Sequence, residues 1–128
     1  MTNVAEEPDA AAVAAAARAR GAYAHTMDGR YLGDKVATLD AIAAALSFPG
    51  WFGRNLDALY DCLTDLSWLP VGEHVLIWVS SGGLATADPK AYLAIRGVLS
   101  DAQRALAPAG DRTDGHQLTV VLARTACA

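Results

Sequence analysis

Residues 74–79 read HVLIWV, in which one histidine is followed by five apolar residues, most of them β-branched or aromatic. A strand exposed on one face alternates apolar and polar side chains, whereas a strand buried on both faces is apolar throughout. The turn Pro-Val-Gly precedes the run at 70–72, and the flexible connection Ser-Ser-Gly-Gly follows it at 80–83. We therefore expect residues 74–79 to form a strand buried on both faces.

Shorter segments on either side of this run predict two more strands. Residues 22–27 precede the turn pair Asp28-Gly29, and residues 117–122 read QLTVVL. Helical segments separate the three strands, and this order is typical of a small α/β unit with a parallel sheet. Right-handed crossovers would place the main helices on the same side of a three-stranded sheet.

The helical segments carry apolar residues at helical spacing and recognisable N-caps. A proline just inside a helix also fits its first turn, as Pro89 does here. The expected caps and helices are Thr38 before residues 39–48, Asn55 before residues 56–66, and Asp88 before residues 89–107.

An alanine-rich segment, DAAAVAAAARAR at 9–20, precedes the first strand. Alanine has the highest helix propensity, and the acid at the start and the arginines at the end complement the helix dipole. Because Val13 is its only large apolar residue, we expect a short, loosely docked helix outside the core. The expected organisation is a tail and helix over residues 1–21 and a domain over residues 22–128.

Composition limits the classes of function. The chain has 128 residues, a formal charge of −4 and two cysteines, which fits one domain in a reducing cytoplasm. No apolar run approaches the roughly 18 residues of a membrane span, and the acidic start lacks the basic region of a secretory signal. The acidic balance disfavours nucleic acid and membranes as partners and favours a cationic one.

The predicted helix over residues 56–66 has two contrasting sides. Its apolar stripe consists of Leu56, Leu59, Cys62, Leu63 and Leu66. Asp57, Asp61 and Asp65 follow each other at intervals of four on the opposite side, and no basic residue of the helix is four positions from any of them. Like charges at that spacing repel by about 0.2–0.5 kcal/mol per pair. Unrelieved repulsion is expected at a binding surface, although an accidental acidic face is the alternative.

Aromatic residues lie next to these acids. Trp51 and Phe52 stand between Gly50 and Gly53 just before the helix, and Tyr60 borders the aspartates on the helical wheel. Aromatic anchors are common in interface hot spots, so Trp51 and Tyr60 are candidate contact residues. Phe52 is better explained as a core residue.

Residues 48–66, FPGWFGRNLDALYDCLTDL, resemble the signature of the barstar family, intracellular inhibitors of secreted bacterial ribonucleases. The similarity includes the proline before the aromatic pair, Asn-Leu-Asp-Ala-Leu at 55–59 and Asp-Cys-Leu-Thr at 61–64. The order of predicted elements agrees over about residues 22–123. The resemblance implies a small barstar-like fold, with the alanine-rich helix as an N-terminal addition.

In that family the loop and helix plug the ribonuclease active site, with carboxylates where substrate phosphates bind. The resemblance therefore implies that Asp57 and Asp61 face basic residues of a secreted ribonuclease in a one-to-one complex. It also implies that Trp51 stacks on the catalytic site. Its remaining implied contacts are Asn55, Leu56, Tyr60 and, on the last long helix, Asp101, for which an ordinary exposed aspartate is the alternative.

Some features depart from the family pattern. Residues 1–20 have no counterpart, and the loop 108–116 is longer than expected. Residues 80–87 are short and glycine-rich where the family has a small helix. Arg54 places a positive charge inside the signature, where it would weaken the negative field.

Other functions have weaker support in the sequence. Phosphate-binding, zinc-protease and serine-hydrolase motifs are absent from the sequence. His25, His74 and His116 have no cysteine or acid at a ligand spacing, and we expect no metal and no cofactor. The alternatives are an immunity protein of the same fold for another cationic toxin nuclease, and a small Mg²⁺-dependent enzyme that uses the aspartates.

Overall fold

The computed structural model describes residues 7–107 and 115–125. The expected loop 108–116 therefore lies mostly outside the described residues, as does Cys127. The elements are α1 (Ala10–Ala19), β1 (Tyr23–Asp28), α2 (Lys35–Ala45), α3 (Leu56–Asp65), β2 (Gly72–Val79), α4 (Gly82–Ala87), α5 (Pro89–Ala105) and β3 (His116–Ala123).

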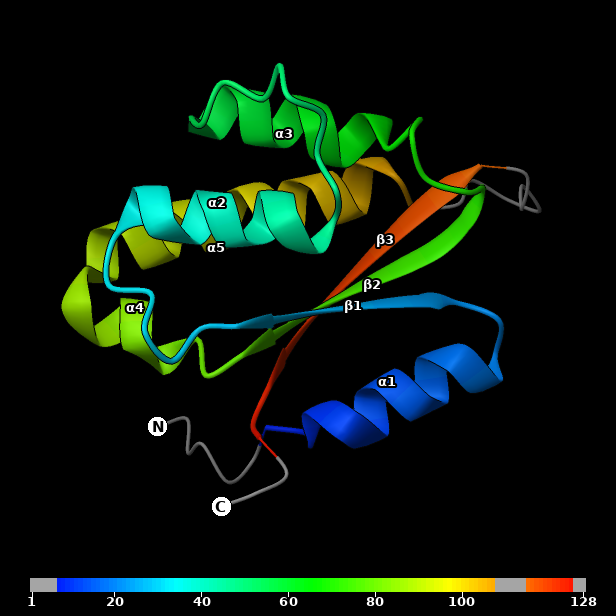
Figure 1. The fold of residues 1–128 in the computed structure, drawn as a ribbon, viewed down its shortest axis with the longest axis horizontal. Coiled ribbons are helices and arrows are strands. Elements are labelled where there is room, and N and C mark those ends of the chain that lie inside the picture. Colours follow the sequence, from blue (N-terminus) through cyan, green and yellow to red (C-terminus); the bar gives the residue numbers. More distant parts are fainter. Residues whose placement is uncertain (1–6, 108–114, 126–128) are drawn as a thin grey trace.

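The three strands form one parallel sheet in the order β1-β2-β3, as the sequence predicts. The central strand β2 pairs Val75 with Ala24 on one side and with Thr119 on the other. Residues 74–79 are all buried, which confirms the strand that was expected from HVLIWV. The helices α2, α3 and α5 lie on one side of the sheet and α1 lies on the other (Figure 1).

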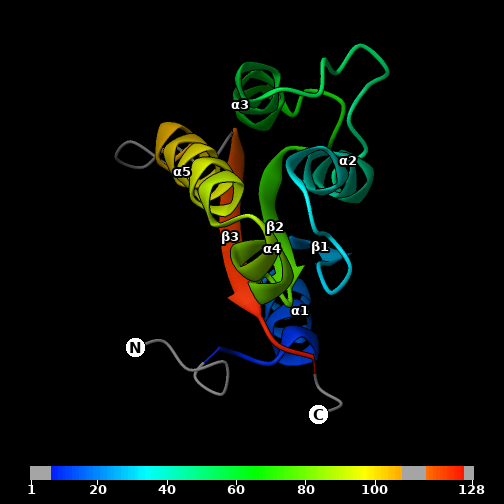
Figure 2. The same ribbon diagram turned by 90° about the vertical axis from the view of Figure 1, so that its left-hand side faces the viewer.

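Two apolar layers hold these elements together. Side chains of α2, α3 and α5 pack with one face of the sheet around the buried Trp78, Leu39, Leu59 and Leu99. Figure 2 shows that α2 and α5 lie next to the sheet and that α3 lies further out. The apolar side of α3 is therefore buried beneath it, and its opposite side is presented to solvent.

The helix α1 covers the second face of the sheet, so the expectation that it lies outside the core is wrong. Ala14 and Ala17 are buried against Val75, Ile77 and Val79. Alanine has no large side chain to bury, but its small size lets a helix lie close to the strands. Because this close packing needs no large side chain, the spacing of large apolar residues does not predict it.

Polar contacts also tie α1 to the sheet. At its carboxyl end, Arg20 donates two hydrogen bonds of 3.0 Å to the Glu73 carboxylate of β2. This guanidinium is the main reason that the pKa of Glu73 is lowered. At its amino end, Asp9 caps the helix by accepting from the amide of Ala12, and the backbone of Ala10 donates to the carbonyl of Arg124 at 2.9 Å.

The helix caps are predicted well in two of three places. Asn55 accepts a hydrogen bond from the amide of Ala58, and Asp88 accepts one from that of Ala91. Thr38 is not a cap, because α2 begins a turn earlier and Asp34 accepts from Ala37. Thr38 instead lies buried in the first turn, where its hydroxyl donates to the carbonyl of Asp34 at 2.9 Å.

The small helix α4 follows β2, although the sequence predicts only a short glycine-rich connection there. Leu84 is fully buried in the main core, which anchors this turn of helix. Gly83 is required because a side chain at this position would meet the carbonyl of Gly29 at 2.8 Å. The close approach explains the glycine, and the expected departure from the family at residues 80–87 is wrong.

The three histidines, which are far apart in sequence, form a row across the sheet. The rings of His25 and His116 stack on opposite sides of His74, which is fully buried. The Nε2 of His74 lies 2.7 Å from the carbonyl of Pro70, so this nitrogen carries the proton. The Nδ1 of His74 lies within hydrogen-bonding distance of the Nε2 of His25, at 3.0 Å.

The histidine row is expected to make stability depend on pH. Burial, followed by repulsion from His74, lowers the pKa of His25 below its ordinary value, although the carbonyl of Ala45 opposes the shift. The unfolded chain therefore binds a proton at His25 at a higher pH than the folded chain does. The free energy of unfolding is therefore expected to decline from its value at pH 8 as the pH falls below about 6.5. It should level off below the pKa of His25 in the folded state.

Urea unfolding of wild type and His25→Gln between pH 8 and pH 5 measures this effect. The wild type should lose more unfolding free energy than the variant over this interval. Equal losses in both proteins would show that His25 does not link protonation to folding.

Candidate partner-binding surface

The helix α3 is fixed in orientation by its buried stripe. Leu59, Cys62, Leu63 and Leu66 are fully buried and Leu56 is partly buried, as the spacing predicts. Burial, with smaller contributions from Asp65 and Asp61, raises the pKa of the Cys62 thiol. Cys62 is thus a protonated core residue rather than a nucleophile.

The opposite side of α3 carries the acidic face, by which we mean Asp57, Asp61 and Asp65. All three residues are exposed. Within residues 7–107 and 115–125, none of them forms an ion pair with a basic side chain. Asp65 accepts a hydrogen bond of 3.1 Å from the hydroxyl of Ser67. The acidic face therefore keeps its negative charge uncompensated by a local cation.

An aromatic cluster supports the loop that leads into α3. This aromatic loop comprises residues 47–54, and both Ser47 and Arg54 have positive φ, at 55° and 56°. Phe48 and Phe52 pack edge to face, with their ring centroids 5.0 Å apart. Both pack against the main core, as expected for Phe52. Trp51 is 64% exposed. The loop therefore presents one large aromatic side chain to solvent beside the acidic face.

Trp68 completes this cluster and was missed by the sequence analysis. Its Nε1 donates to the carbonyl of Leu46 at 2.9 Å, which fixes the ring. Trp51 meets it edge to face, with the ring centroids 6.5 Å apart. Trp68 follows α3 in a segment without periodicity, so its sequence position carried no signal of this role.

Most of the predicted site residues lie together on α3 and the loop before it. Tyr60 is exposed on the same helix as the acidic face. Asn55 uses its side chain to start α3, accepting from Ala58 and donating to the carbonyl of Gly53. Leu56 packs partly against the core. Asn55 and Leu56 are therefore committed to the fold as well as being candidate contacts.

Asp101 lies apart from the others, on α5. Its carboxylate forms an ion pair with Arg104, one turn further along the same helix. Both side chains are largely exposed. In the free protein the charge of Asp101 is thus already compensated, unlike that of the acidic face.

Arg54 is also compensated, which the sequence analysis did not foresee. Its guanidinium donates two hydrogen bonds, of 2.9 and 2.8 Å, to the carboxylate of Asp40 on α2. The expected weakening of the negative field by Arg54 is therefore offset by an acid from a different helix.

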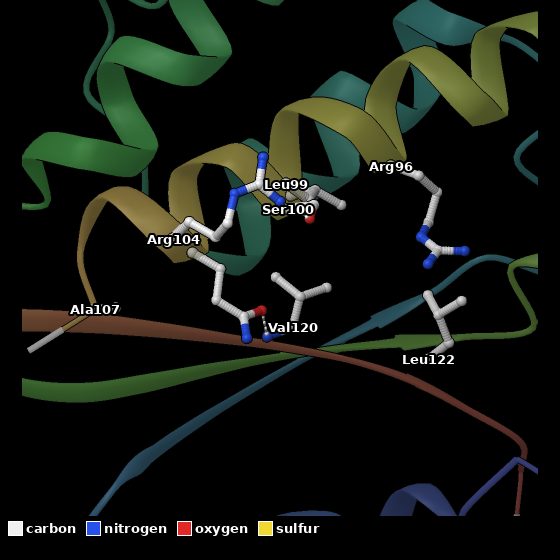
Figure 3. A pocket seen from close by; sticks show the side chains of 8 residues that line it. Arg96, Leu99, Ser100, Arg104, Ala107, Val120 and Leu122 are labelled. Carbon is white, nitrogen blue, oxygen red and sulfur yellow. Dashed lines mark hydrogen bonds between the residues drawn. The ribbon is translucent and has the colours of Figure 1, made fainter.

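A cavity of about 260 Å³ lies between α5 and the edge strand β3, and Arg96 and Arg104 of α5 are among the residues that line it (Figure 3). Gln103 reaches across it and accepts a hydrogen bond of 2.9 Å from the amide of Val120. The side chain thus occupies an edge group that could otherwise pair with another strand. None of the predicted site residues lines this cavity.

Residues 7–107 and 115–125 contain no group of three or more histidine, cysteine, aspartate or glutamate side chains that could hold a metal ion. Among the helices formed by these residues, none is both long enough and apolar enough to cross a membrane.

A three-stranded parallel sheet covered by helices, with an acidic helix and an aromatic loop on its outer side, defines a small α/β protein. Residues 22–123 match the family described as barstar (barnase inhibitor). The chain belongs to this family.

One curated relative is similar over a shorter stretch. A protein of Bacillus subtilis (strain 168), named "Putative ribonuclease inhibitor YrdF", is 44% identical over 45 residues. These residues make up 35% of this chain and 50% of that protein. The match thus spans about half the length of the relative.

Proposed function

We propose that this protein inhibits a basic, secreted bacterial ribonuclease of the barnase type by forming a one-to-one complex. The observation that carries the proposal is the exposed acidic face of α3, uncompensated by basic side chains, next to the exposed Trp51. Family membership supports the same conclusion.

The mechanism we propose is occupation of the ribonuclease active site. A ribonuclease binds phosphate groups through basic side chains, and carboxylates of suitable spacing can take the place of those phosphates. Asp57 and Asp61 are one helical turn apart and would face these basic groups, with Asp65 at the end of the row. Attraction between opposite charges would also accelerate the encounter.

The aromatic residues supply the apolar part of the contact in this proposal. Trp51 would stack on the catalytic site, and the cluster beneath it would hold the indole in place before binding. Tyr60 would extend the contact along α3. Asn55 and Leu56 would contribute at the start of the helix, and Asp101 would add a contact from α5.

The biological role that follows is protection of the producing cell. A ribonuclease that is exported is harmful only while it remains inside, so its inhibitor would act in the cytoplasm. Binding to nucleic acid or to a membrane is not part of this proposal.

Titration of barnase with the purified protein tests the proposed function. RNA cleavage should fall linearly and reach zero at one equivalent of inhibitor. The Asp57→Asn/Asp61→Asn variant should require a large excess. Undiminished cleavage in the presence of excess wild type, together with binding to a cationic DNase, would favour the immunity protein instead.

A further inference from the structure

Asp40 and Arg54 form a contact that the proposed function does not require by itself. Two hydrogen bonds join the carboxylate on α2 to the guanidinium just before α3. Asp40 lies on α2 and Arg54 is the last residue of the aromatic loop, so the contact links the end of that loop to α2. The side chains are 51% and 55% exposed.

The position of Arg54 makes its charge consequential. It stands three residues before Asp57, within the surface that would meet a basic partner. An uncompensated guanidinium there would repel such a partner and reduce the negative potential of the acidic face. Asp40 carries the opposite charge next to Arg54, so an approaching partner meets no net charge from the pair. This holds however little the pair contributes to the stability of the fold.

The backbone of Arg54 gives the contact a second consequence. Its φ of 56° lies in the left-handed region, which is unfavourable for a residue with a side chain. Such a conformation persists where surrounding contacts fix it. The two hydrogen bonds that Arg54 donates to the Asp40 carboxylate are contacts of this kind at the end of the aromatic loop.

We propose that Asp40 is a positioning residue for partner binding, which compensates the charge of Arg54 and anchors the aromatic loop to α2. This inference rests on the proposed function. It assigns a role to a residue outside the family signature stretch of residues 48–66. It also predicts that the two members of the pair have opposite effects on association.

A double-mutant cycle with barnase as the probe separates these effects. At low salt, Asp40→Asn should slow association about two- to five-fold, because the charge of Arg54 is then uncompensated. Arg54→Gln should accelerate association by a similar factor. The double variant should associate at close to the wild-type rate.

Asp28→Asn is the matched control. Asp28 and Arg30 form an exposed pair at 2.9 Å, with side-chain exposures of 50% and 55%, at the end of β1 near α4. Asp40→Asn and Asp28→Asn both change the formal charge from −4 to −3. Equal association rates for these two variants would overturn the proposal.

A second readout needs no ribonuclease. The amide of Phe52 donates to the carbonyl of Pro49 at 3.1 Å inside the loop, and its hydrogen exchange reports loop opening. Exchange there should be about two- to five-fold faster in Asp40→Asn and in Arg54→Gln, and unchanged in Asp28→Asn. Unchanged exchange in both loop variants would overturn the anchoring role.

These readouts distinguish failure of the inference from failure of the proposed function. Wild type that does not bind barnase would contradict the proposed function, and the exchange rates would still decide the anchoring of the loop. Wild type that binds, with indistinguishable Asp40→Asn and Asp28→Asn variants, would contradict only the inference. Because Arg54→Gln replaces no residue of α2, it keeps the test valid if Asp40→Asn melts early.

Discussion

Asp61→Asn is expected to weaken ribonuclease inhibition by about one and a half to three and a half orders of magnitude and to leave the free protein at least as stable as wild type. In the free protein Asp61 lies one turn from both Asp57 and Asp65, and each such pair of like charges costs about 0.2–0.5 kcal/mol. Asparagine removes both repulsions and nearly preserves the shape. In the complex, the same change would leave a basic group of the enzyme desolvated without its partner.

The size of the loss follows from that stranded charge. Truncating one member of a buried charge pair costs about 2–5 kcal/mol, a range partly defined by the barnase–barstar complex itself. Inhibition constants and thermal melts of both proteins, with and without EDTA, measure the two expectations. A clear drop in melting temperature would instead make Asp61 a structural residue. Destabilisation of wild type alone by EDTA would indicate a bound metal.

Removal of residues 1–21 is expected to destabilise the protein severely, by about 10 °C or more in melting temperature. The truncation uncovers the face of the sheet that carries Val75, Ile77 and Val79, which are now buried. Burial of one such side chain is worth about 1.5–3 kcal/mol, and a typical domain has only about 5–15 kcal/mol in total. Calorimetry or urea unfolding of the shortened chain measures this loss.

A pair of substitutions provides a control that keeps the chain length. Ala17 is fully buried against the sheet, whereas its neighbour Ala16 is exposed on the same helix. Ala17→Asp should destabilise the protein by several times as much as Ala16→Asp, because only Ala17→Asp places a carboxylate against the sheet. Both changes reduce helix propensity equally, so the difference between them reports the burial of α1. Similar effects of the two substitutions would mean that α1 contributes little to the core.

Elements whose signal is local were predictable from the sequence. Five consecutive apolar residues indicate the strand β2, and the caps Asn55 and Asp88 accept hydrogen bonds from amides three residues away. The two sides of α3 follow from helical spacing alone. This is why most of the candidate surface, apart from Asp101, could be located before the fold was known.

Features that depend on packing across the chain were not predictable in the same way. Asp34 rather than Thr38 caps α2, and Thr38 lies buried inside the first turn, where its burial depends on the rest of the fold. The histidine row and the Asp40–Arg54 contact join residues 49 and 14 positions apart. The burial of α1 depends on how closely alanines approach the sheet, which no periodicity of large side chains reports.

Mapping the contact by NMR shows directly whether the acidic face and Trp51 bind the ribonuclease. Amide and indole signals of the ¹⁵N-labelled protein can be followed as unlabelled barnase is added to one equivalent. We expect the largest shifts on Trp51 and on Asp57 to Asp65, while α1 and the cavity between α5 and β3 change little. Shifts concentrated on α1 or on that cavity, with the acidic face unaffected, would contradict this expectation.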